Sequence, residues 1–468
     1  MQGKSLIQKT GLYFIGNLSS KIMSTLIIPI YAFYVKANDL GYYDYTQTIM
    51  SILIPVFFVA IWEAILRHLL YETDEIQKRK VISTSTGFTI LMSFIVILLM
   101  GIYRGFIDPE TKFVLFITVM FIVYALTQIW QYYARALSKN KLYILSGIIG
   151  TFINFISVLV FICILKLGLK GLFISYILGQ ASIFLLIESR LHILREFKIK
   201  YFDVNILKKM LVFSIPLVLN LTSAWVLSGF GKTLIADKLG TDMNGLFSFA
   251  SKFSILVTMI GSVVTMAVIE EAIITVKTKG FNSEFTRIIE NVFKIFVTLA
   301  LLSIPIIKVF YFFIRDTEYY SSFSYAPWLI ISAVLITMAS NVGAIFQAIN
   351  KTKYQFTTTL FGAVITIIIS FTLISIMGVY SVILGQILGG LAMLFARYFL
   401  VNRYVDFKVN WKPIVIAFSF LLLIILISTN TSILVNVIIL ILTAIIVSYR
   451  NKNYLVISYK ILKNRFKR

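Results

Sequence analysis

Apolar residues run through the chain in fourteen long blocks, and polar or charged residues gather in the short stretches between them. Most blocks hold about 17 to 25 mainly apolar residues, the length that an α-helix needs to cross a bilayer. The predicted spans are 11–35, 42–66, 81–103, 113–134, 143–165, 171–188, 211–235, 243–268, 288–313, 325–349, 354–377, 379–401, 413–429 and 431–449. The pattern therefore predicts an all-α integral membrane protein with about fourteen transmembrane helices.

Composition supports this class and argues against others. Hydrophobic residues make up 59% of the 468 residues and charged residues 13%, which is more apolar than a soluble domain. The single cysteine, Cys163, lies in a predicted span, so no disulfide framework or cysteine metal site is expected. The net charge of +23 is carried mainly between the spans, where basic residues set orientation and meet anionic lipid. We expect membrane lipids as partners, and no nucleic acid.

The distribution of basic residues predicts the orientation. With the N-terminus in the cytoplasm, the outer connections carry seven basic residues: Lys36, Arg104, Lys112, Lys166, Lys170, Lys238 and Arg315. Five lysines lie within spans, and the other 31 of the 43 basic residues fall on the inner side. Because Lys and Arg accumulate in cytoplasmic loops, both termini are predicted to be cytoplasmic. The first apolar segment is read as an uncleaved span.

Short motifs recur between two halves of the chain. Ile177-Leu178-Gly179-Gln180 returns as Ile383-Leu384-Gly385-Gln386, residues 136–141 resemble 348–353, and residues 41–45 resemble 245–249. The offsets of 206, 212 and 204 residues are nearly constant. Because six spans are an even number, duplicated halves share their orientation, as in transporters with parallel repeats. We predict six-helix bundles over 1–205 and 206–410, and two additional helices with a basic cytoplasmic tail over 411–468.

Four predicted spans carry continuous polar stripes, at spacings of three and four residues that place each set on one helical face. These are the first two spans of each half, and a helix that is polar on one face is expected to line a cleft. The stripes are Asn17, Ser20, Lys21 and Ser24; Asp44, Thr48, Ser51 and Pro55; Asn220, Ser223, Ser228 and Lys232; and Ser248, Ser251, Lys252 and Ser254.

Lys21 and Lys252 are the main candidates for a binding site. A lysine at the centre of a spanning helix costs about 2.5 to 3.5 kcal/mol on insertion scales, so it usually faces a cavity or a partner. Together the two ammonium groups suit a pyrophosphate or an acidic sugar, with Asn17 and Ser24 on the same face as Lys21. The alternative is a structural lysine that pairs with an acid or reaches the interface along its stem.

Other charged residues near the spans are weaker candidates. Lys232 lies near the outer surface, and Arg67 at the inner end of the second span could guide a phosphate or pair with Glu63 one turn away. Asp44 and Glu63 are candidates for binding a coupling cation, although Asp44 lies close enough to a helix end to be an ordinary solvated carboxylate. Gln128 and Gln131 form a polar stripe with Arg135, which we interpret as packing and interfacial anchoring.

No enzyme signature is found. His68 and His192 lack neighbours with metal-ligand spacing, and no glycine-rich phosphate loop is present, so we expect no metal, no cofactor and no catalytic residues.

Several motifs together resemble the Wzx-type polysaccharide flippases of the multidrug/oligosaccharidyl-lipid/polysaccharide exporter superfamily. They are residues 16–21 (GNLSSK), Pro29, residues 39–42 (DLGY), residues 213–217 (FSIPL) and residues 244–252 (NGLFSFASK). In the position where relatives often carry Asp-Arg, this chain has Gly231-Lys232, so the charge pair usual there is missing and a carried-over role for Lys232 is weakened.

The resemblance implies the parallel two-bundle arrangement of MATE-like transporters and a place in the bacterial cytoplasmic membrane. It implies that undecaprenyl-pyrophosphate-linked repeat units of O-antigen or capsule are moved to the outer leaflet, with a coupling cation and with polysaccharide polymerase and glycosyltransferases as partners. Three alternatives remain open: a lipid II flippase, a cation-coupled drug antiporter, which should have acidic cavities, and an integral-membrane glycosyltransferase or polymerase, which should show catalytic acids and a large external loop.

Overall fold

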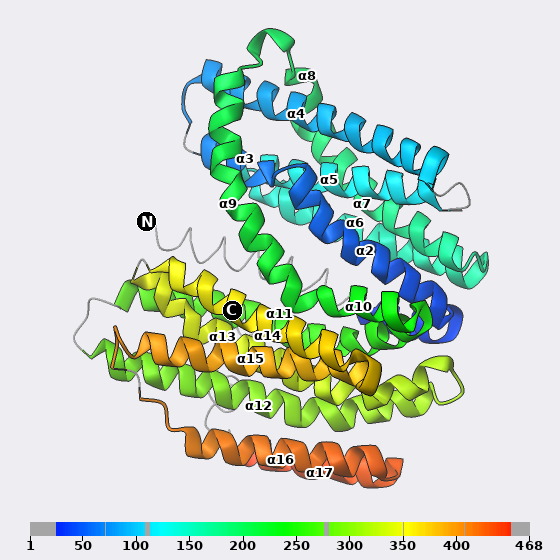
Figure 1. The fold of residues 1–468 in the computed structure, drawn as a ribbon, viewed down its shortest axis with the longest axis vertical. Coiled ribbons are helices and arrows are strands. Elements are labelled where there is room, and N and C mark those ends of the chain that lie inside the picture. The colour runs from blue at the N-terminus through cyan, green and yellow to red at the C-terminus, as the bar shows by residue number, and fades with distance from the viewer. Residues whose placement is uncertain are drawn as a thin grey trace, which may run out of the picture. The chain divides into compact units, whose positions relative to one another are not determined.

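The computed structural model describes residues 25–450 apart from 71, 108–112, 276–279, 350 and 407. The predicted site residues Asn17, Lys21 and Ser24 lie outside the described residues. The described chain is nearly all helical and contains no strand, as the ribbon in Figure 1 shows. It forms two compact units, one up to Ser248 and one from Phe249 onward, with the boundary inside one helix.

The first unit begins with a short apolar helix over Thr25–Tyr34. Its other helices are α2 (Ala37–Phe57), α3 (Ile61–Leu69), α4 (Glu75–Ile102), α5 (Val114–Ala136), α6 (Asn140–Val158), α7 (Leu169–Leu191), α8 (Ile193–Glu196), α9 (Val204–Ser228), α10 (Phe230–Leu239) and the start of α11 (Thr241–Thr275). Because α9 packs on α2, α3 and α4, and α10 packs on α2, the unit extends past residue 205. The division into six-helix bundles at 205/206 stays a prediction.

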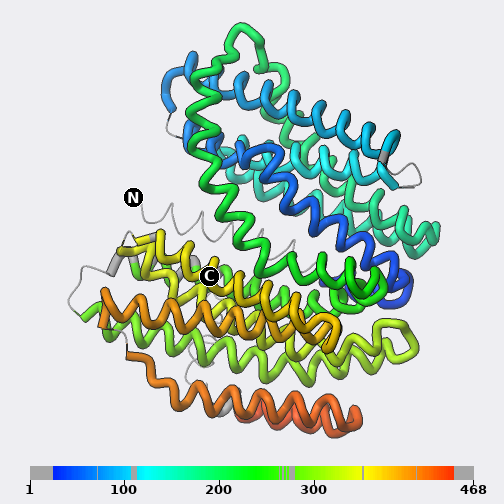
Figure 2. Tube along the Cα trace, viewed as in Figure 1, coloured from blue at the N-terminus to red at the C-terminus, as the bar shows by residue number. Residues whose placement is uncertain are grey.

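The second unit contains the rest of α11, then α12 (Phe281–Phe313), α13 (Ala326–Ala348), α14 (Thr352–Met377), α15 (Val379–Val401), α16 (Trp411–Asn430) and α17 (Ile433–Arg450). Its core is α13, which contains five alanines and has a central apolar stretch that is 89% buried. Small side chains let neighbouring membrane helices approach closely. Figure 2 traces the chain through both units.

The number of spans agrees with the prediction. Among the described residues, eleven helices are long and apolar enough to cross a membrane, and the bent pair α2 and α3 makes a twelfth. Two shorter apolar helices, Thr25–Tyr34 and Ile433–Ile446, lie where the first and last spans are predicted. The protein is therefore a multi-pass membrane protein with about fourteen spans.

Each unit contains a helix pair that packs backbone against backbone. A Cβ added to Gly150 of α6 would lie 2.9 Å from the carbonyl oxygen of Gly179 on α7. In the second unit, a Cβ added to Gly362 of α14 would lie 2.8 Å from the carbonyl oxygen of Gly389 on α15. These pairs are the fifth and sixth spans of the two predicted halves, so the repeated sequence motifs accompany a repeated packing arrangement.

The second predicted span, 42–66, is two helices and not one. Val59 and Ala60 have φ angles of 49° and 42°, a left-handed conformation that costs free energy for residues with a side chain. Helix α3 consequently turns 54° from α2. The break follows Pro55, and the hydroxyl of buried Ser214 on α9 donates to the Ala60 carbonyl at 3.3 Å. Contacts from a neighbouring helix therefore hold the bend in place.

Candidate functional site

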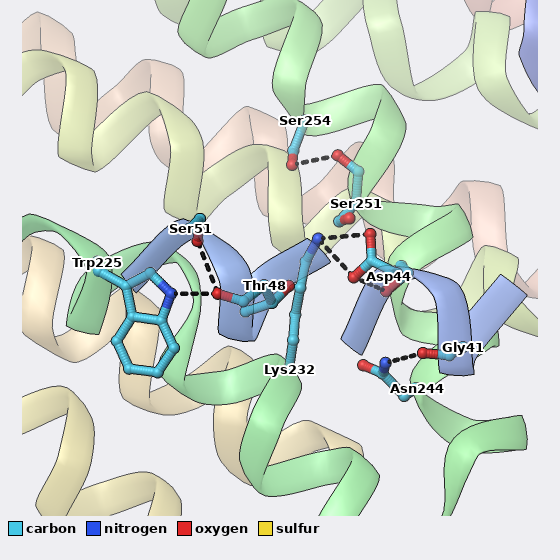
Figure 3. A network of polar contacts seen from close by, with 10 residues as sticks. Gly41, Asp44, Thr48, Ser51, Trp225, Lys232, Asn244, Ser251 and Ser254 are labelled. Atoms are coloured by element: carbon cyan, nitrogen blue, oxygen red, sulfur yellow. Dashed lines mark hydrogen bonds and ion pairs between the residues drawn. The ribbon is translucent and has the colours of Figure 1, made fainter. Parts of the chain in front are cut away.

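A buried carboxylate on α2 receives side chains from the seventh and eighth predicted spans. Asp44 is only 8% exposed. The ammonium of Lys232 on α10 lies 3.1 Å from Oδ1 and 2.9 Å from Oδ2 of Asp44, and the hydroxyl of Ser248 on α11 donates to Oδ2 at 2.7 Å. Figure 3 shows Lys232 beside the Asp44 carboxylate. The polar stripes of three predicted spans thus meet at one carboxylate.

Burial explains why Asp44 needs these partners. A carboxylate held among apolar helices loses its hydration, and only an opposite charge with further hydrogen bonds compensates that loss. The prediction that Asp44 is an ordinary solvated group is therefore wrong: its helix end is covered by α10 and α11. Lys232 is also not without an acid partner, because α2 supplies the acid that is missing beside it in the sequence. In this arrangement the two charges neutralise each other.

Further hydrogen bonds join α2 and α11 between Asp44 and the start of α2. The side-chain amide of Asn244 on α11 donates to the Gly41 carbonyl at 2.8 Å. The amide of Asn38 donates to Thr241 Oγ1 at 2.7 Å and to Asp242 Oδ2 at 3.0 Å. These bonds place the first turns of α2 and α11 against each other, at the end that the basic-residue pattern predicts to face outward.

Two glycines let the two helices touch there. A Cβ on Gly41 would lie 1.7 Å from the Thr241 carbonyl oxygen, and a Cβ on Gly245 would lie 1.9 Å from the Ala37 carbonyl oxygen. Distances this short exclude any side chain. Gly41 and Gly245 are the residues that begin the matched motifs of the two halves, so this part of the repeat is also a contact.

One helical turn after Asp44, the indole of Trp225 on α9 contacts α2. Its Nε1 donates to the Thr48 carbonyl at 2.9 Å, and the Ser51 hydroxyl donates to that carbonyl at 2.7 Å. Figure 3 shows both bonds. The Thr48 carbonyl thus gains two side-chain donors as the chain approaches the break after Pro55.

Lys252, the predicted anion-binding lysine of the eighth span, lies on α11 in the second unit. It follows Ser248 by four residues, which is one helical turn. Its proposed counterpart Lys21 and the neighbours Asn17 and Ser24 lie outside the described residues. The assignment of these four residues to substrate binding stays a prediction.

Glu63 and Arg67 on α3 do not form the expected ion pair. The hydroxyl of Tyr132 on α5 donates to Glu63 at 2.7 Å, and the guanidinium of Arg67 lies 4.3 Å from the ring centroid of Phe213 on α9. A cation over an aromatic face is stabilised by the ring quadrupole. The two residues contact different helices, and their assigned roles in substrate guidance and cation binding stay predictions.

Arg397 on α15 is a buried residue that sequence analysis missed. It is 3% exposed and donates from Nε to Thr358 at 3.0 Å and from Nη1 to the Ala339 carbonyl at 2.8 Å. Its Nη2 donates to Thr359 at 2.8 Å and to the Gln355 carbonyl at 3.4 Å. No ion pair to Arg397 is found within the described part of the chain. The signal was an arginine placed a full turn inside an apolar span.

Within the described ranges, no group of three or more His, Cys, Asp or Glu side chains could hold a metal ion.

Comparison with solved structures identifies the fold. The lipid II flippase MurJ in an inward closed conformation matches with a TM-score of 0.71 and 16% identity, covering 96% of this chain and 100% of that chain. An inward-facing MATE transporter of the MOP (multidrug/oligosaccharidyl-lipid/polysaccharide) superfamily matches with a TM-score of 0.66 and 15% identity, covering 83% and 97%. Its outward-facing counterpart matches with a TM-score of 0.60 and 14% identity, covering 86% and 96%. The fold is that of this superfamily, as the sequence resemblance predicts.

The family follows from the sequence itself. The model of the polysaccharide biosynthesis protein family matches residues 6–270, more than half of the chain. The protein belongs to this family. No functionally curated protein matches the chain.

Proposed function

We propose that the protein moves undecaprenyl-pyrophosphate-linked oligosaccharide repeat units, of the O-antigen or capsule type, from the cytoplasmic to the outer leaflet of the bacterial cytoplasmic membrane. The observation that carries the proposal is that a member of the polysaccharide biosynthesis family carries charged side chains within its predicted apolar spans, two of them buried. Asp44 and Lys232 pair on α2 and α10, and Lys252 lies on α11. Charges at such positions usually serve a substrate or ion pathway.

The pyrophosphate of the proposed substrate accounts for the lysines within the predicted spans. A lipid-linked oligosaccharide carries a pyrophosphate that must pass the hydrocarbon layer, and fixed ammonium groups replace the hydration of that group. Lys21 and Lys252 are the proposed ligands, with Asn17 and Ser24 beside Lys21. Arg67 at the cytoplasmic end and Lys232 are further candidates, and Asp44 and Glu63 are candidates for a coupling cation. The polyprenyl tail stays in lipid.

The contact between α2 and α11 supports alternating access. It consists of two glycines against backbone and of side-chain hydrogen bonds. Such a contact closes the predicted outer end and can open when the helices move as rigid bodies. The break at Val59 and Ala60 supplies a bend in the same span. No covalent step is required, and we expect no enzymatic activity.

A second candidate function is flipping of a lipid II-type peptidoglycan precursor. It is favoured by the fold likeness to the lipid II flippase MurJ, which extends over 96% of this chain. Polysaccharide polymerase and glycosyltransferases are the proposed protein partners.

Depletion of the protein tests the proposal. The lipid-linked saccharide that accumulates on the cytoplasmic side should be an undecaprenyl-pyrophosphate repeat unit, and accumulation of lipid II instead would select the second candidate. In the same strain, Lys21→Ala and Lys252→Ala should abolish or strongly reduce surface polysaccharide at matched protein level. Lys294→Ala, an exposed lysine on α12, is the control and should export normally. Normal export by all three variants would contradict the anion site.

A further inference from the structure

A polar cavity lies entirely within the first unit. None of the residues that line it belongs to the cluster of Asp44, Lys232 and Ser248. The cavity has a volume of about 240 Å³ and is lined by α5, α6 and α7. Its lining consists of Tyr124, Thr127, Gln128, Gln131, Tyr143, Ile144, Gly147, Thr151, Gln180 and Ile183.

Seven of the ten lining residues carry a polar side chain, and none of the ten is charged. Tyr124, Thr127, Gln128 and Gln131 follow spacings of three and four on α5, so they share one face of that helix. Polar side chains on membrane helices are costly unless a partner uses them. The interpretation of Gln128 and Gln131 as packing residues therefore leaves their polarity unexplained.

The glutamine side chains have no protein partner in the described part of the chain. The amides of Gln128, Gln131 and Gln180 make no hydrogen bond to another described residue, although the Gln180 backbone carbonyl accepts from Thr127 at 2.8 Å. Each amide offers two N–H donors and a carbonyl acceptor. Three such groups around one cavity therefore present donors and acceptors to a ligand or to water.

We propose that this cavity binds an uncharged sugar ring of the transported lipid-linked oligosaccharide, an inference that rests on the proposed function. Sugar hydroxyls are both donors and acceptors, which matches carboxamides and threonine hydroxyls, and the apolar face of a pyranose packs on aromatic rings such as Tyr124. The absence of charge from the lining favours a neutral ring over a phosphate or an acidic sugar. In the predicted topology the cavity lies in the middle and inner parts of the spans, on the side where the substrate is made.

Gly147 on α6 provides a way to fill the cavity. A Cβ added there would meet nothing within 4 Å, whereas one added to Gly150 one turn later would meet Ile183 at 2.2 Å. Gly147→Phe should therefore occupy the cavity without disturbing the contact between α6 and α7. Gly101→Phe is the matched control, because Gly101 is an exposed helix position on α4 that also has nothing within 4 Å. Gln128→Leu/Gln131→Leu removes the polar groups at similar volume.

The test compares two pairs of lipids for binding to the full-length protein in nanodiscs, followed by native mass spectrometry. The first pair is undecaprenyl pyrophosphate with and without one N-acetylglucosamine, and the second is diacylglycerol with and without one glucose. The wild type and Gly101→Phe should bind the glycosylated member of each pair about tenfold more tightly, as expected for a few net hydrogen bonds. Gly147→Phe and Gln128→Leu/Gln131→Leu should reduce both ratios to about one.

Equal binding of the two members in the wild type, or a sugar preference that survives both variants, would overturn the sugar site. The second pair carries no phosphate, so it tests the cavity without the anion site. The anion site of the proposed function is read separately, from the affinity for undecaprenyl pyrophosphate alone, which Lys252→Ala should lower and Gly147→Phe should leave unchanged.

Discussion

The ammonium of Lys232 lies 2.9 Å from Oδ2 of Asp44, although 188 residues separate the two in sequence. Both side chains are largely buried, at 16% and 12% exposure, so the pair differs from exposed pairs such as Lys238 with Asp237. A buried pair is held less by its attraction than by the high cost of leaving either charge alone. It fixes α10 against α2 at the place where Ser248 of α11 also reaches the carboxylate.

Breaking this pair on one side should destabilise the protein more than removing both charges. Asp44→Asn leaves the Lys232 charge without an acid and should cost about 3 kcal/mol, while Asp44→Asn/Lys232→Met should recover much of that loss. Asp237→Asn, in the exposed pair with Lys238, should change stability by less than about 1 kcal/mol. Thermal unfolding of the purified proteins in one detergent measures all three. An Asp44→Asn protein as stable as Asp237→Asn would show that the pair is dispensable.

Enlarging Gly41 or Gly245 should open the contact between α2 and α11. In either alanine variant, the added methyl group would overlap a carbonyl oxygen of the neighbouring helix. The two helices must therefore separate. In a Cys163→Ser background, a cysteine at buried Thr48 should then react faster with an impermeant maleimide added from outside. Gly101→Ala is the control, because its site is open. Unchanged reactivity in both glycine variants would mean that this contact does not close the outer end.

The orientation can be tested at two exposed lysines. Lys170 lies in the first turn of α7 and Lys141 in the first turn of α6, on opposite sides of the predicted membrane. With Cys163 replaced by serine, a cysteine at 170 should react with an impermeant reagent outside intact cells, and one at 141 should react only after the cells are opened. The reverse pattern would invert the whole topology. The Cys163→Ser change itself should be nearly silent, since the chain has no second thiol.

At Arg397, the substitution that keeps the charge, Arg397→Lys, should destabilise the protein more than Arg397→Met. Arg397→Lys keeps a buried charge but loses the fork that reaches Thr358, Thr359 and the Ala339 carbonyl together. At about 1 kcal/mol per lost bond it should cost about 2 to 3 kcal/mol. Arg397→Met removes the charge at similar length, and both threonine hydroxyls keep bonds within α14, so it should cost less. Thermal unfolding gives the order, and a lysine variant equal to wild type would show that charge alone suffices.

Much of the fold could be predicted from sequence, because each segment that crosses the bilayer must satisfy its backbone hydrogen bonds without water. Long apolar blocks had to be helices, and the described helices fall where the blocks lie. The break at Val59 and Ala60 could not be predicted, because neither residue favours a left-handed conformation and the bend depends on contacts such as that of Ser214. Pro55 was the only local signal.

The site was predicted less well than the fold, for a related reason. Polar stripes identified the helices that meet, but periodicity does not say which residue of one stripe faces which residue of another. Asp44 was judged by its distance from a helix end, whereas its burial depends on α10 and α11, which come much later in the chain. The glutamines of α5 were judged one helix at a time, and only the packing of α6 and α7 reveals that they surround a cavity.

The position of Arg397 late in the chain matters for how the protein is made. Every group that accepts a hydrogen bond from its guanidinium lies on α13 or α14, which leave the ribosome before α15 does. We therefore expect the acceptors to be in place when α15 enters the bilayer, so that the arginine can reach them without first lying alone in lipid. The order of synthesis thus lowers the free energy of inserting α15, which by itself would be high. A circular permutation that placed α15 first would remove that advantage.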